Sequence, residues 1–179
     1  MADVAQQFKQ FNVDIINPEE TPPKWEGAGV VEEFHPPTLE ASVMEYQASG
    51  MDMPILLDMG MEALTARLVV NGYFTQVFST FGRANQTQTE FVAHGGLRSI
   101  RGQDSEVTFR MRGNVIHVSQ GRVRGRGELP RVNLGIALVY YEVKIGPDTP
   151  IIIDVLNMTR VINSNDVLEG MRSAIGLAI

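Results

Sequence analysis

The most concentrated group of functional side chains is a run of arginines in the second half of the chain. Three of them alternate with small or apolar residues over positions 122–127 and a fourth follows shortly afterwards: Arg122, Arg124, Arg126 and Arg131. Guanidinium groups bind phosphates and carboxylates through paired hydrogen bonds, so this run is suited to RNA or to an acidic protein surface. Because it is short, contains no aromatic residue and lies between two strand-like patterns, we interpret it as a hairpin loop that contacts an acidic surface of a neighbouring copy.

The other residue types that could catalyse a reaction are dispersed. The chain has no cysteine, which excludes disulfides, thiolate nucleophiles and Cys-ligated metals. Its three histidines, His35, His94 and His117, are far apart in the sequence, although a three-His metal site could still assemble in space. Glu32 and Glu33 are adjacent, so on a regular strand they point to opposite faces and cannot act together as acid and base. There is no phosphate-binding glycine loop, dinucleotide fingerprint or nucleophile elbow, and we predict no catalytic, cofactor or metal site.

Length and composition describe one globular unit. The 179 residues suffice for one domain with a core, predicted to span residues 1–179, and 44% hydrophobic with 20% charged residues is typical of a folded protein. The formal net charge of −6 opposes general attraction to nucleic acid. Acidic residues dominate the first third and basic residues the middle, a separation that lets copies attract each other head to tail and form rings or filaments. Two solvated faces that never meet are the alternative interpretation.

The sequence also gives no sign of a membrane segment. No stretch is long and apolar enough to cross a membrane as a helix, and the first twelve residues lack the basic start and apolar core of a signal peptide. We therefore expect a protein of a soluble compartment with no membrane anchoring.

Hydrophobic periodicity predicts mostly strands. Apolar and polar residues alternate over 107–112, and Gly113 interrupts the pattern before it resumes, which predicts a bulged or kinked strand. The segment 132–141 is apolar on both faces, so we expect both faces to be covered, one of them by another subunit. A turn at 146–150 then leads into an apolar strand over 151–156, which predicts a hairpin. Further predicted strands cover 8–16, 28–34, 39–48, 55–58, 63–70 and 89–100.

Helical signals are few. An aromatic stripe at three- and four-residue spacing over 73–81, followed by Gly82, predicts an amphipathic helix packed on a sheet. We interpret the stripe as part of the core and not as a cofactor-stacking site. A second short helix is predicted to begin at Ser164 or Asn165 and to run toward Met171.

Several motifs in the second half of the chain carry a family resemblance. In order, they are Met111-Arg112-Gly113, the pair Tyr140-Tyr141, the string Ile153-Asp154-Val155-Leu156-Asn157-Met158, the segment Asn165-Asp166-Val167-Leu168-Glu169, and the closing Ile175-Gly176-Leu177. This series resembles the major tail tube proteins of contractile-tailed phages, which have relatives in R-type bacteriocins. The resemblance continues more faintly through residues 48–51, the strand 63–70 and the aromatic helix, so it spans most of the chain. The first forty residues depart from it.

The resemblance implies a mostly β fold with a small α component. In it, two packed antiparallel sheets form a β-sandwich or barrel with one flanking helix and a short C-terminal helix, and hexameric rings of subunits close a large inter-subunit barrel. Closing such a barrel removes exposed sheet edges, which fits a strand that is apolar on both faces. The motif residues are expected to be structural, with Asp154 and Asn157 forming hydrogen bonds near a strand end. The full set of motif residues is Met111, Arg112, Gly113, Ile153, Asp154, Asn157 and Met158.

The function that the resemblance implies is structural and not enzymatic: the inner tail tube of a contractile phage tail, built from stacked rings without a cofactor, as a conduit for genome delivery into the host cell. The implied partners are further copies of the chain, the tail sheath protein, the tape measure protein, and baseplate or terminator proteins, in a virion tail assembled in the host cytoplasm. Genomic DNA would pass without specific binding, so we predict a net acidic or neutral lumen. The arginine run is then expected at contacts between rings, between subunits or toward the sheath.

Other functions remain open at this point. A tube of a phage-derived contractile injection particle or bacteriocin, or a secretion-system tube, would share the same features. An alternative of a different class is a small soluble β-barrel module that binds a ligand or acts as an enzyme.

Overall fold

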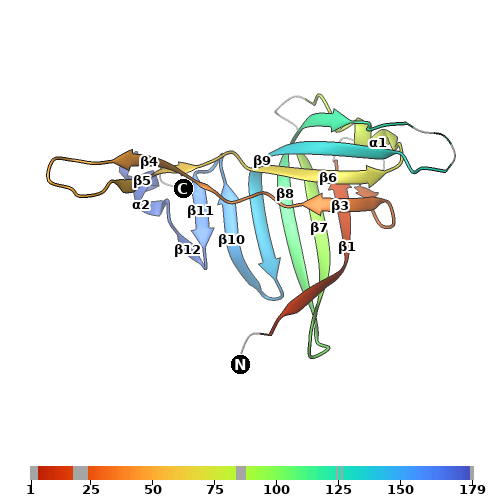
Figure 1. Ribbon diagram of the computed structural model, residues 1–179, viewed down its shortest axis with the longest axis horizontal. Helices are drawn as coiled ribbons and strands as arrows, with labels where there is room; N and C mark the ends of the chain where they lie inside the picture. Colours follow the sequence, from red (N-terminus) through yellow and green to blue (C-terminus); the bar gives the residue numbers. More distant parts are fainter. Residues whose placement is uncertain (1–3, 18–23, 84–87, 124, 126, 178–179) are drawn as a thin grey trace.

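The computed structural model describes residues 4–17, 24–83, 88–123, 125 and 127–177. Within these residues the chain forms twelve strands and two short helices (Figure 1), which confirms the predicted mostly β fold with a small α component. The strands are β1 (Gln6–Ile16), β2 (Lys24–Glu26), β3 (Val31–His35), β4 (Ala41–Tyr46), β5 (Ile55–Met61), β6 (Thr65–Asn71), β7 (Thr89–Ser99), β8 (Asp104–Ser119), β9 (Arg131–Ile145), β10 (Asp148–Asp154), β11 (Thr159–Ile162) and β12 (Asn165–Asp166). The helices are α1 (Thr75–Phe78) and α2 (Glu169–Ala174).

Ten of the strands form one antiparallel sheet, and two form a separate hairpin. The main sheet runs in the order β12-β11-β10-β9-β8-β7-β1-β2, and β6 joins it by pairing with both β9 and β3. Among the described strands, β4 and β5 pair only with each other. In Figure 1 this hairpin projects beyond the rest of the molecule, at the end opposite α1. The predicted hairpin around residues 146–150 is confirmed as the β9–β10 turn.

The main sheet folds into two layers because two long strands pass from one layer to the other. The first half of β9 pairs with β6 and its second half with β10, while β8 follows β9 along most of its length. The register of the β8–β9 ladder shifts at Gly113, where a Cβ atom would collide with the carbonyl oxygen of Ala137. Glycine permits this close approach, and the bulge bends the strand. The predicted kink and the predicted pair of packed antiparallel sheets are confirmed, although the described strands of one chain do not close into a barrel.

One core fills the space between the layers. Every second side chain of the long strands points into it, as the two-residue period of a strand requires, and Phe91 and Met111 are almost fully buried. Phe34 of β3 meets Phe109 of β8 across the layers, with 5.7 Å between the ring centroids. Tyr141 of β9 also lies in the core, where burial raises its pKa to about 12.

Both helices are shorter than the sequence predicts. The segment 73–81 contains only α1, and its stripe packs on the core only in part. Val77 is fully buried and the rings of Phe74 and Trp25 lie 5.5 Å apart, whereas Tyr73 and Phe81 are exposed. The predicted start of the second helix is wrong, because 165–166 forms β12 and α2 begins only after residue 168. The Asp166 carboxylate accepts hydrogen bonds from the backbone amides of Leu168 and Arg160, so it ties this segment to β11 instead of capping a helix at residue 165.

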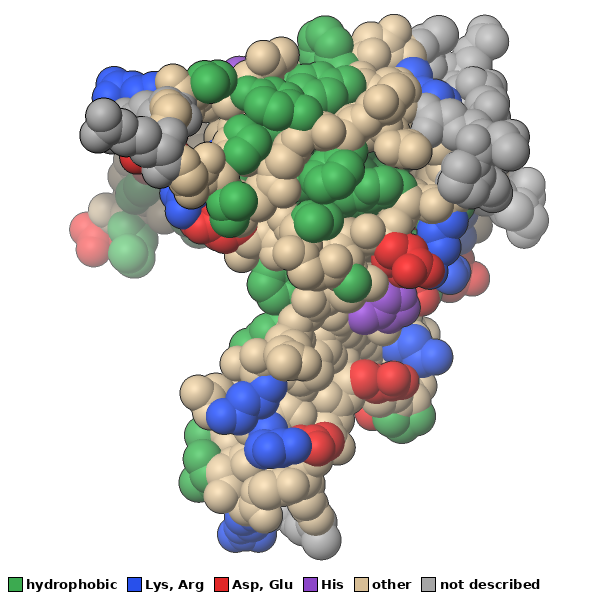
Figure 2. Space-filling model, turned by 90° about the vertical axis from the view of Figure 1, so that its right-hand side faces the viewer, with side chains coloured by type: hydrophobic (Ala, Val, Ile, Leu, Met, Phe, Trp, Pro, Cys, Tyr) green, Lys and Arg blue, Asp and Glu red, His purple; other side chains and the backbone are tan. Residues whose placement is uncertain are grey.

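The lower ends of β1, β7 and β8 extend beyond the sandwich. We call residues 6–11 together with 97–107 the stalk. In a view from the side of β1 and β2, the stalk is narrower than the body above it and carries Lys, Arg, Asp and Glu side chains, whereas apolar side chains gather on the body (Figure 2). Phe8 in the stalk is 48% exposed. The stalk and the β4–β5 hairpin are thus two parts of the chain that reach outside the sandwich.

Candidate assembly surface

The β4–β5 hairpin is a projecting arm whose only contact with the core, among the described residues, is Met61 at its base. We define the arm as residues 40–62, whose base is closed by the hydrogen bond from the Glu62 amide to the Glu40 carbonyl oxygen. No residue of β4 or β5 is buried, and Met53 at the tip is 70% exposed. A two-stranded hairpin on its own is at best marginally stable in water. A covering partner is therefore needed to hold the arm in one conformation.

Cross-strand pairing gives the arm two different faces. One face carries only large apolar side chains, from the pairs Met44–Leu57 and Tyr46–Ile55. The other face alternates apolar and acidic side chains, from the pairs Val43–Asp58 and Glu45–Leu56. All eight side chains are exposed. Because burying one large apolar side chain contributes roughly 1.5–3 kcal/mol, covering the uniformly apolar face would stabilise both the arm and the contact.

The charges of the arm all have the same sign. Its carboxylates are Glu40, Glu45, Asp52, Asp58 and Glu62, and the chain has no Lys or Arg between Lys24 and Arg67. Asp58 lies 3.6 Å from the guanidinium of Arg160, which fastens the base of the arm to β11. The arm thus presents carboxylates together with apolar side chains, a combination that complements an apolar surface bearing basic groups.

The structure places two of the four arginines predicted at assembly contacts. Arg122 is exposed in the loop before β9. Arg131 begins β9, and its guanidinium is bonded to the carboxylate of Glu32 on β3. Arg124 and Arg126 lie outside the described residues. Because Arg131 has a partner within its own chain, its part in an assembly stays a prediction.

The motif residues of the second half surround the end of β10. Met111 and Ile153 are buried in the core, while Asp154 ends the strand. The Asp154 carboxylate accepts hydrogen bonds from the backbone amide of Asn157 at 3.1 Å and from its side-chain amide at 2.8 Å. This turn leads into Met158, which has a φ of +48°. These contacts shape the β10–β11 turn.

Arg112, the remaining motif residue, lies on the outer face of the main sheet. Its guanidinium is 4.3 Å from the centroid of the Tyr140 ring and 3.8 Å from the carboxylate of Asp154. Burial and a 2.6 Å hydrogen bond to Glu142 raise the pKa of Tyr140 to about 12, so this phenol remains protonated and donates to Glu142. The aromatic ring and the carboxylate together compensate the charge of Arg112.

The same outer face pairs further cations with anions across its strands. Arg110 of β8 contacts Glu90 of β7 at 3.0 Å and lies opposite Glu142 in the β8–β9 register. Near the end of β1, the Asp14 carboxylate accepts from Lys24 at 3.1 Å, and this hydrogen bond raises the pKa of Lys24. Cross-strand pairs of opposite charge stabilise a sheet modestly. Their larger consequence is a broad polar face on which Lys24, Arg110 and Arg112 each lie beside a carboxylate, whereas Lys144 on the same face has no ion pair among the described residues.

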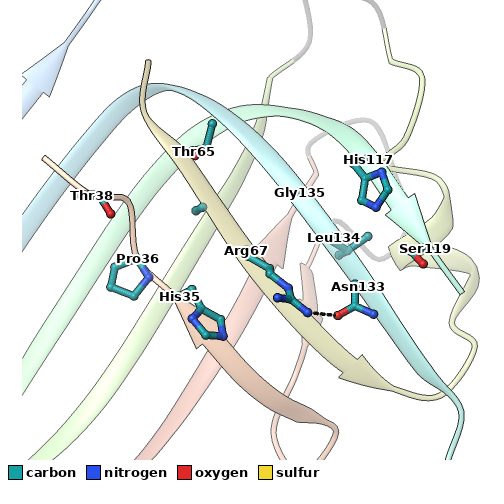
Figure 3. Close-up of a pocket in the computed structure, with 11 residues that line it drawn as sticks. His35, Pro36, Thr38, Thr65, Arg67, His117, Ser119, Asn133, Leu134 and Gly135 are labelled. Atoms are coloured by element: carbon teal, nitrogen blue, oxygen red, sulfur yellow. Dashed lines mark hydrogen bonds between the residues drawn. The ribbon is translucent and has the colours of Figure 1, made fainter. Parts of the chain in front are cut away.

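The outer face of the other layer contains a shallow groove of about 590 Å³. His35 and His117 lie toward its opposite ends, and Arg67 between them donates a 2.7 Å hydrogen bond to Asn133 (Figure 3). His35 is hydrogen-bonded to Glu33, which lowers the pKa of that carboxyl group. Among the residues that line the groove, no hydroxyl group is hydrogen-bonded to a histidine.

The regular strand assumed for Glu32 and Glu33 is interrupted in the structure. β3 has a bulge between Val31 and Glu33, and a bulge breaks the strict alternation of side chains. Glu32 is bonded to Arg131, whose charge also helps to lower the pKa of Glu33. The two carboxylates therefore share one basic neighbour and do not act on separate faces.

Across the described parts of the chain, no cluster of three or more His, Asp or Glu side chains is placed to hold a metal ion. His94 lies on β7, 3.8 Å from Asp14, on a different layer from His35. In those same parts, neither helix has the length and apolar character needed to cross a bilayer.

The sequence patterns missed the projection of the arm. They located its strands at 39–48 and 55–58 but did not indicate that these strands leave the body. Two signals mark the segment: five of the nine methionines fall between residues 44 and 61, and it contains no basic residue. Methionine is frequent on adaptable binding surfaces because its side chain is flexible and polarizable.

Comparisons with known proteins extend this description. The family model for phage tail tube protein FII matches residues 26–176. A chain of the cryo-EM structure of the anti-feeding prophage (AFP) baseplate, 6-fold symmetrised, is similar with a TM-score of 0.57 and 10% identity, over 80% of this chain and 97% of that chain. A chain of the PVC sheath-tube complex in the extended state, from an extracellular contractile injection system, is similar with a TM-score of 0.54 and 9% identity. The similarity covers 75% of this chain and 88% of that chain. At these identities the two structures show a shared fold, and no curated protein matches the sequence.

Proposed function

This chain belongs to the phage tail tube protein FII family, and from that premise we propose that it builds the inner tube of a contractile tail. Copies of the chain join into hexameric rings, the rings stack, and the resulting tube is the conduit for genome delivery into a host cell. The role is structural, with no catalytic step and no cofactor. Strands of neighbouring copies close the inter-subunit barrel and so cover sheet edges that one chain leaves open.

The observation that carries this proposal is the arm. It has a uniformly apolar face, no buried residue and no strand partner among the described residues outside the hairpin. A soluble monomer gains nothing from keeping such a segment in water, because large exposed apolar patches favour association. A second copy that covers the arm removes this cost, so the folded form of the arm belongs to an assembly.

The sixfold ring is supported by the fold shared with a chain of a baseplate structure that is 6-fold symmetrised. It is also supported by the separation of charge along the sequence, since two different complementary surfaces on one chain form head-to-tail contacts. Such contacts close into a ring when the rotation between copies allows it.

In the proposed tube, the polar outer face of the main sheet lines the bore. Lys24, Arg110 and Arg112 on this face lie beside carboxylates, as in the pair Arg110–Glu90. DNA would meet few free cations there, and each phosphate contact avoided lowers the salt-dependent affinity that would retain it. Arg122, Arg124, Arg126 and Arg131 belong instead to contacts between rings, between subunits or with the sheath.

The proposed partners follow from the position of a tube within a tail. The sheath surrounds the tube, the tape measure protein occupies it before ejection, and baseplate and terminator proteins close its two ends. The similarity to chains of a sheath-tube complex and of a baseplate supports the sheath and baseplate as partners. The tail would be assembled in the host cytoplasm.

Electron microscopy of the purified full chain tests the proposal. We expect stacked rings or tubes from the natural sequence, and loss of both when Tyr46→Lys and Leu57→Lys place charges on the apolar face of the arm. Ile116→Lys is the matched control, because Ile116 is an exposed apolar residue on β8 and its replacement should leave the rings intact. A dispersed monomer whose melting temperature rises with a small ligand would contradict the proposal and support a ligand-binding module.

A second candidate is the tube of a contractile injection particle that carries no genome. It is favoured by the similarity to chains of the anti-feeding prophage and of an extracellular contractile injection system. The nucleic acid content of purified particles separates the two: packaged DNA supports a phage tail, and its absence from intact contractile particles supports an injection device.

A further inference from the structure

The longest open sheet edge of the body belongs to β1. One side of β1 pairs with β7 along its whole length, but its other side pairs with β2 only from Asp14 to Ile16. The Val13 carbonyl oxygen accepts from Gly27, and residues 6–12 have no backbone partner on that side among the described residues. These seven residues match the arm strands, which have six residues in β4 and seven in β5. An unpaired edge of this length can accept another strand.

A trough lies beside this open edge. It measures about 820 Å³ and is lined by Lys9 to Asn12 of β1, by the Ala28–Gly29 turn on the open side of β1, and by His94 to Gly96 of β7 on its paired side. The Asn12 side-chain oxygen is buried in the chain and lacks a hydrogen-bond partner. A buried acceptor without a partner is costly. The trough therefore combines space with an open backbone edge, and an unsatisfied acceptor lies beneath its surface.

The stalk end of β1 is built to present an apolar side chain. A bulge at Lys9 shifts the register, which returns Phe8 to the side of Phe11, 6.4 Å away between ring centroids. The Phe8 ring lies so close to Gly95 that a Cβ atom at that position would collide with it. Phe8 is nevertheless half exposed, so its apolar surface is available to a further chain.

The charges near this edge complement the arm. Lys9 and Arg101 form no ion pair with any described residue, whereas Arg98 is paired with Asp104 at 2.6 Å. Among the described residues, the stalk thus holds two cations without an ion pair, and one of them, Lys9, directly follows the exposed Phe8. The arm offers five carboxylates and no basic group. Opposite charges on two surfaces orient their approach and favour this pairing over one between identical arms.

The remaining edges of the body suit the arm less well. β3 carries Glu32 and Glu33, whose charges repel an acidic strand, and Pro36-Pro37 follows it directly. β2 and β12 have only three and two residues. Prolines, acidic side chains and short strands are the usual means by which proteins protect edges from pairing. Over residues 6–12 the β1 edge has no proline and no acidic side chain, and its one charged residue is Lys9 at the bulge.

We infer that the trough along Lys9–Asn12 receives the arm of a second copy, whose edge strand extends the main sheet at β1. The inference rests on the proposed self-assembly and specifies which two surfaces meet. Backbone hydrogen bonds hold the strand, Phe8 contacts the apolar face of the arm, and Lys9 and Arg101 lie near its carboxylates. Because the two surfaces differ, the contact is head to tail and can be repeated from copy to copy.

Cysteine cross-linking tests the pairing on a chain that has no cysteine of its own. Gln10→Cys protein is mixed with Leu56→Cys protein, assembled and mildly oxidised, and the linked peptides are identified by mass spectrometry. The matched control replaces Gln10→Cys with Phe81→Cys, which lies in an exposed aromatic region beside α1. We expect disulfide-linked pairs of Gln10→Cys with Leu56→Cys, at least several-fold above the control. A second mixture with Val43→Cys in place of Leu56→Cys tests the other arm strand.

The outcomes separate this inference from the proposed function. Rings or tubes with links at residue 10 support both. Rings or tubes that link residue 81 to the arm, or that give no link at residue 10 with either arm strand, overturn the inference and leave the tube proposal standing. A chain that remains dispersed under all conditions overturns both.

Discussion

The sandwich body and the arm are made from the same kinds of residue but differ in what stabilises them. In the body, strands that alternate apolar and polar residues place one face in a closed core, where Phe91 and Leu134 are fully buried. In the arm, β4 and β5 carry similar apolar side chains, yet Leu56 is 64% exposed. The pattern of apolar and polar residues does not by itself distinguish the arm from the body, because both contain antiparallel strand pairs. The difference lies in whether the partner surface belongs to the same chain.

This contrast explains how one polypeptide can be both stable and incomplete. The body can fold as a unit, since its layers bury each other's apolar faces. We expect the arm to become ordered when another copy covers it, so that its conformation reports on assembly. Changes in the body should therefore alter the free energy of unfolding, whereas changes in the arm should alter the association of copies.

Removal of the Phe91 ring should have the largest effect on stability. Phe91→Ala leaves a cavity at the centre of the core and is expected to lower the free energy of unfolding by about 3–5 kcal/mol. Leu56→Ala in the arm should change it by no more than about 0.5 kcal/mol, because that side chain is already in water. Urea unfolding of dilute, unassembled protein, followed by the fluorescence of the single tryptophan, measures both. Equal losses for the two variants would show that the arm is part of the folded body.

An added methyl group at Gly113 should have the next largest effect. Gly113→Ala forces a Cβ atom against the carbonyl oxygen of Ala137 where β8 passes between the layers, and a loss of about 1–3 kcal/mol is expected. Gly170→Ala is the control, because Gly170 on α2 has open space around its Cβ position. The same urea titration should show no loss of stability for that variant. A stable Gly113→Ala protein would mean that the crossing can relax and does not depend on glycine.

The arm should show its dependence on other copies in hydrogen exchange. In dilute protein we expect the amides of β4 and β5 to exchange quickly, while those of β9 remain protected. Assembly should slow exchange in the arm by about tenfold or more, which corresponds to about 1.4 kcal/mol of added local stability. Mass spectrometry of the peptides before and after assembly measures both regions at once. An arm that is equally protected in the dilute chain would remove the distinction between arm and body.

The sequence predicted the body better than the arm for a physical reason. Alternation marks buried strands, so the sequence predicts strands over 107–112 and 132–141, and Gly113, which interrupts the alternation, predicts the kink. The short helices were less accurate, because the Asp166 carboxylate bonds to backbone amides of a turn instead of capping a helix. The direction in which the arm projects is set by tertiary contacts at its base, such as Asp58 with Arg160. No local pattern encodes such a contact.

The C-terminal segment, which contains α2, is intermediate between the body and the arm. A change at its anchor should have the smallest of the predicted effects. Its apolar side chains Met171 and Ile175 are exposed, as in the arm, but Arg172 anchors α2 within the same chain. The Arg172 guanidinium contacts the Asp166 carboxylate at 2.7 Å and donates to the Met158 carbonyl oxygen at 2.9 Å. If this anchor holds α2, loss of the Asp166 charge should loosen the segment without unfolding the body.

Titration of Asp166 tests that anchor. Desolvation raises the pKa of this carboxyl group, but hydrogen bonds from Arg172 and from the backbone amides of Leu168 and Arg160 outweigh it, so the pKa in the folded chain is lowered. The stabilisation is therefore complete above the ordinary value of about 3.9 and is lost as the pH falls through the lower folded value. Methyl NMR signals of Ile175 in dilute protein should shift over that acidic range, and Asp166→Asn should show the loosened spectrum already at pH 7. Asp104→Asn, in the stalk, should leave them unchanged. Ile175 signals that are insensitive to both pH and Asp166→Asn would place the C-terminal segment with the arm, as a part ordered only by other copies.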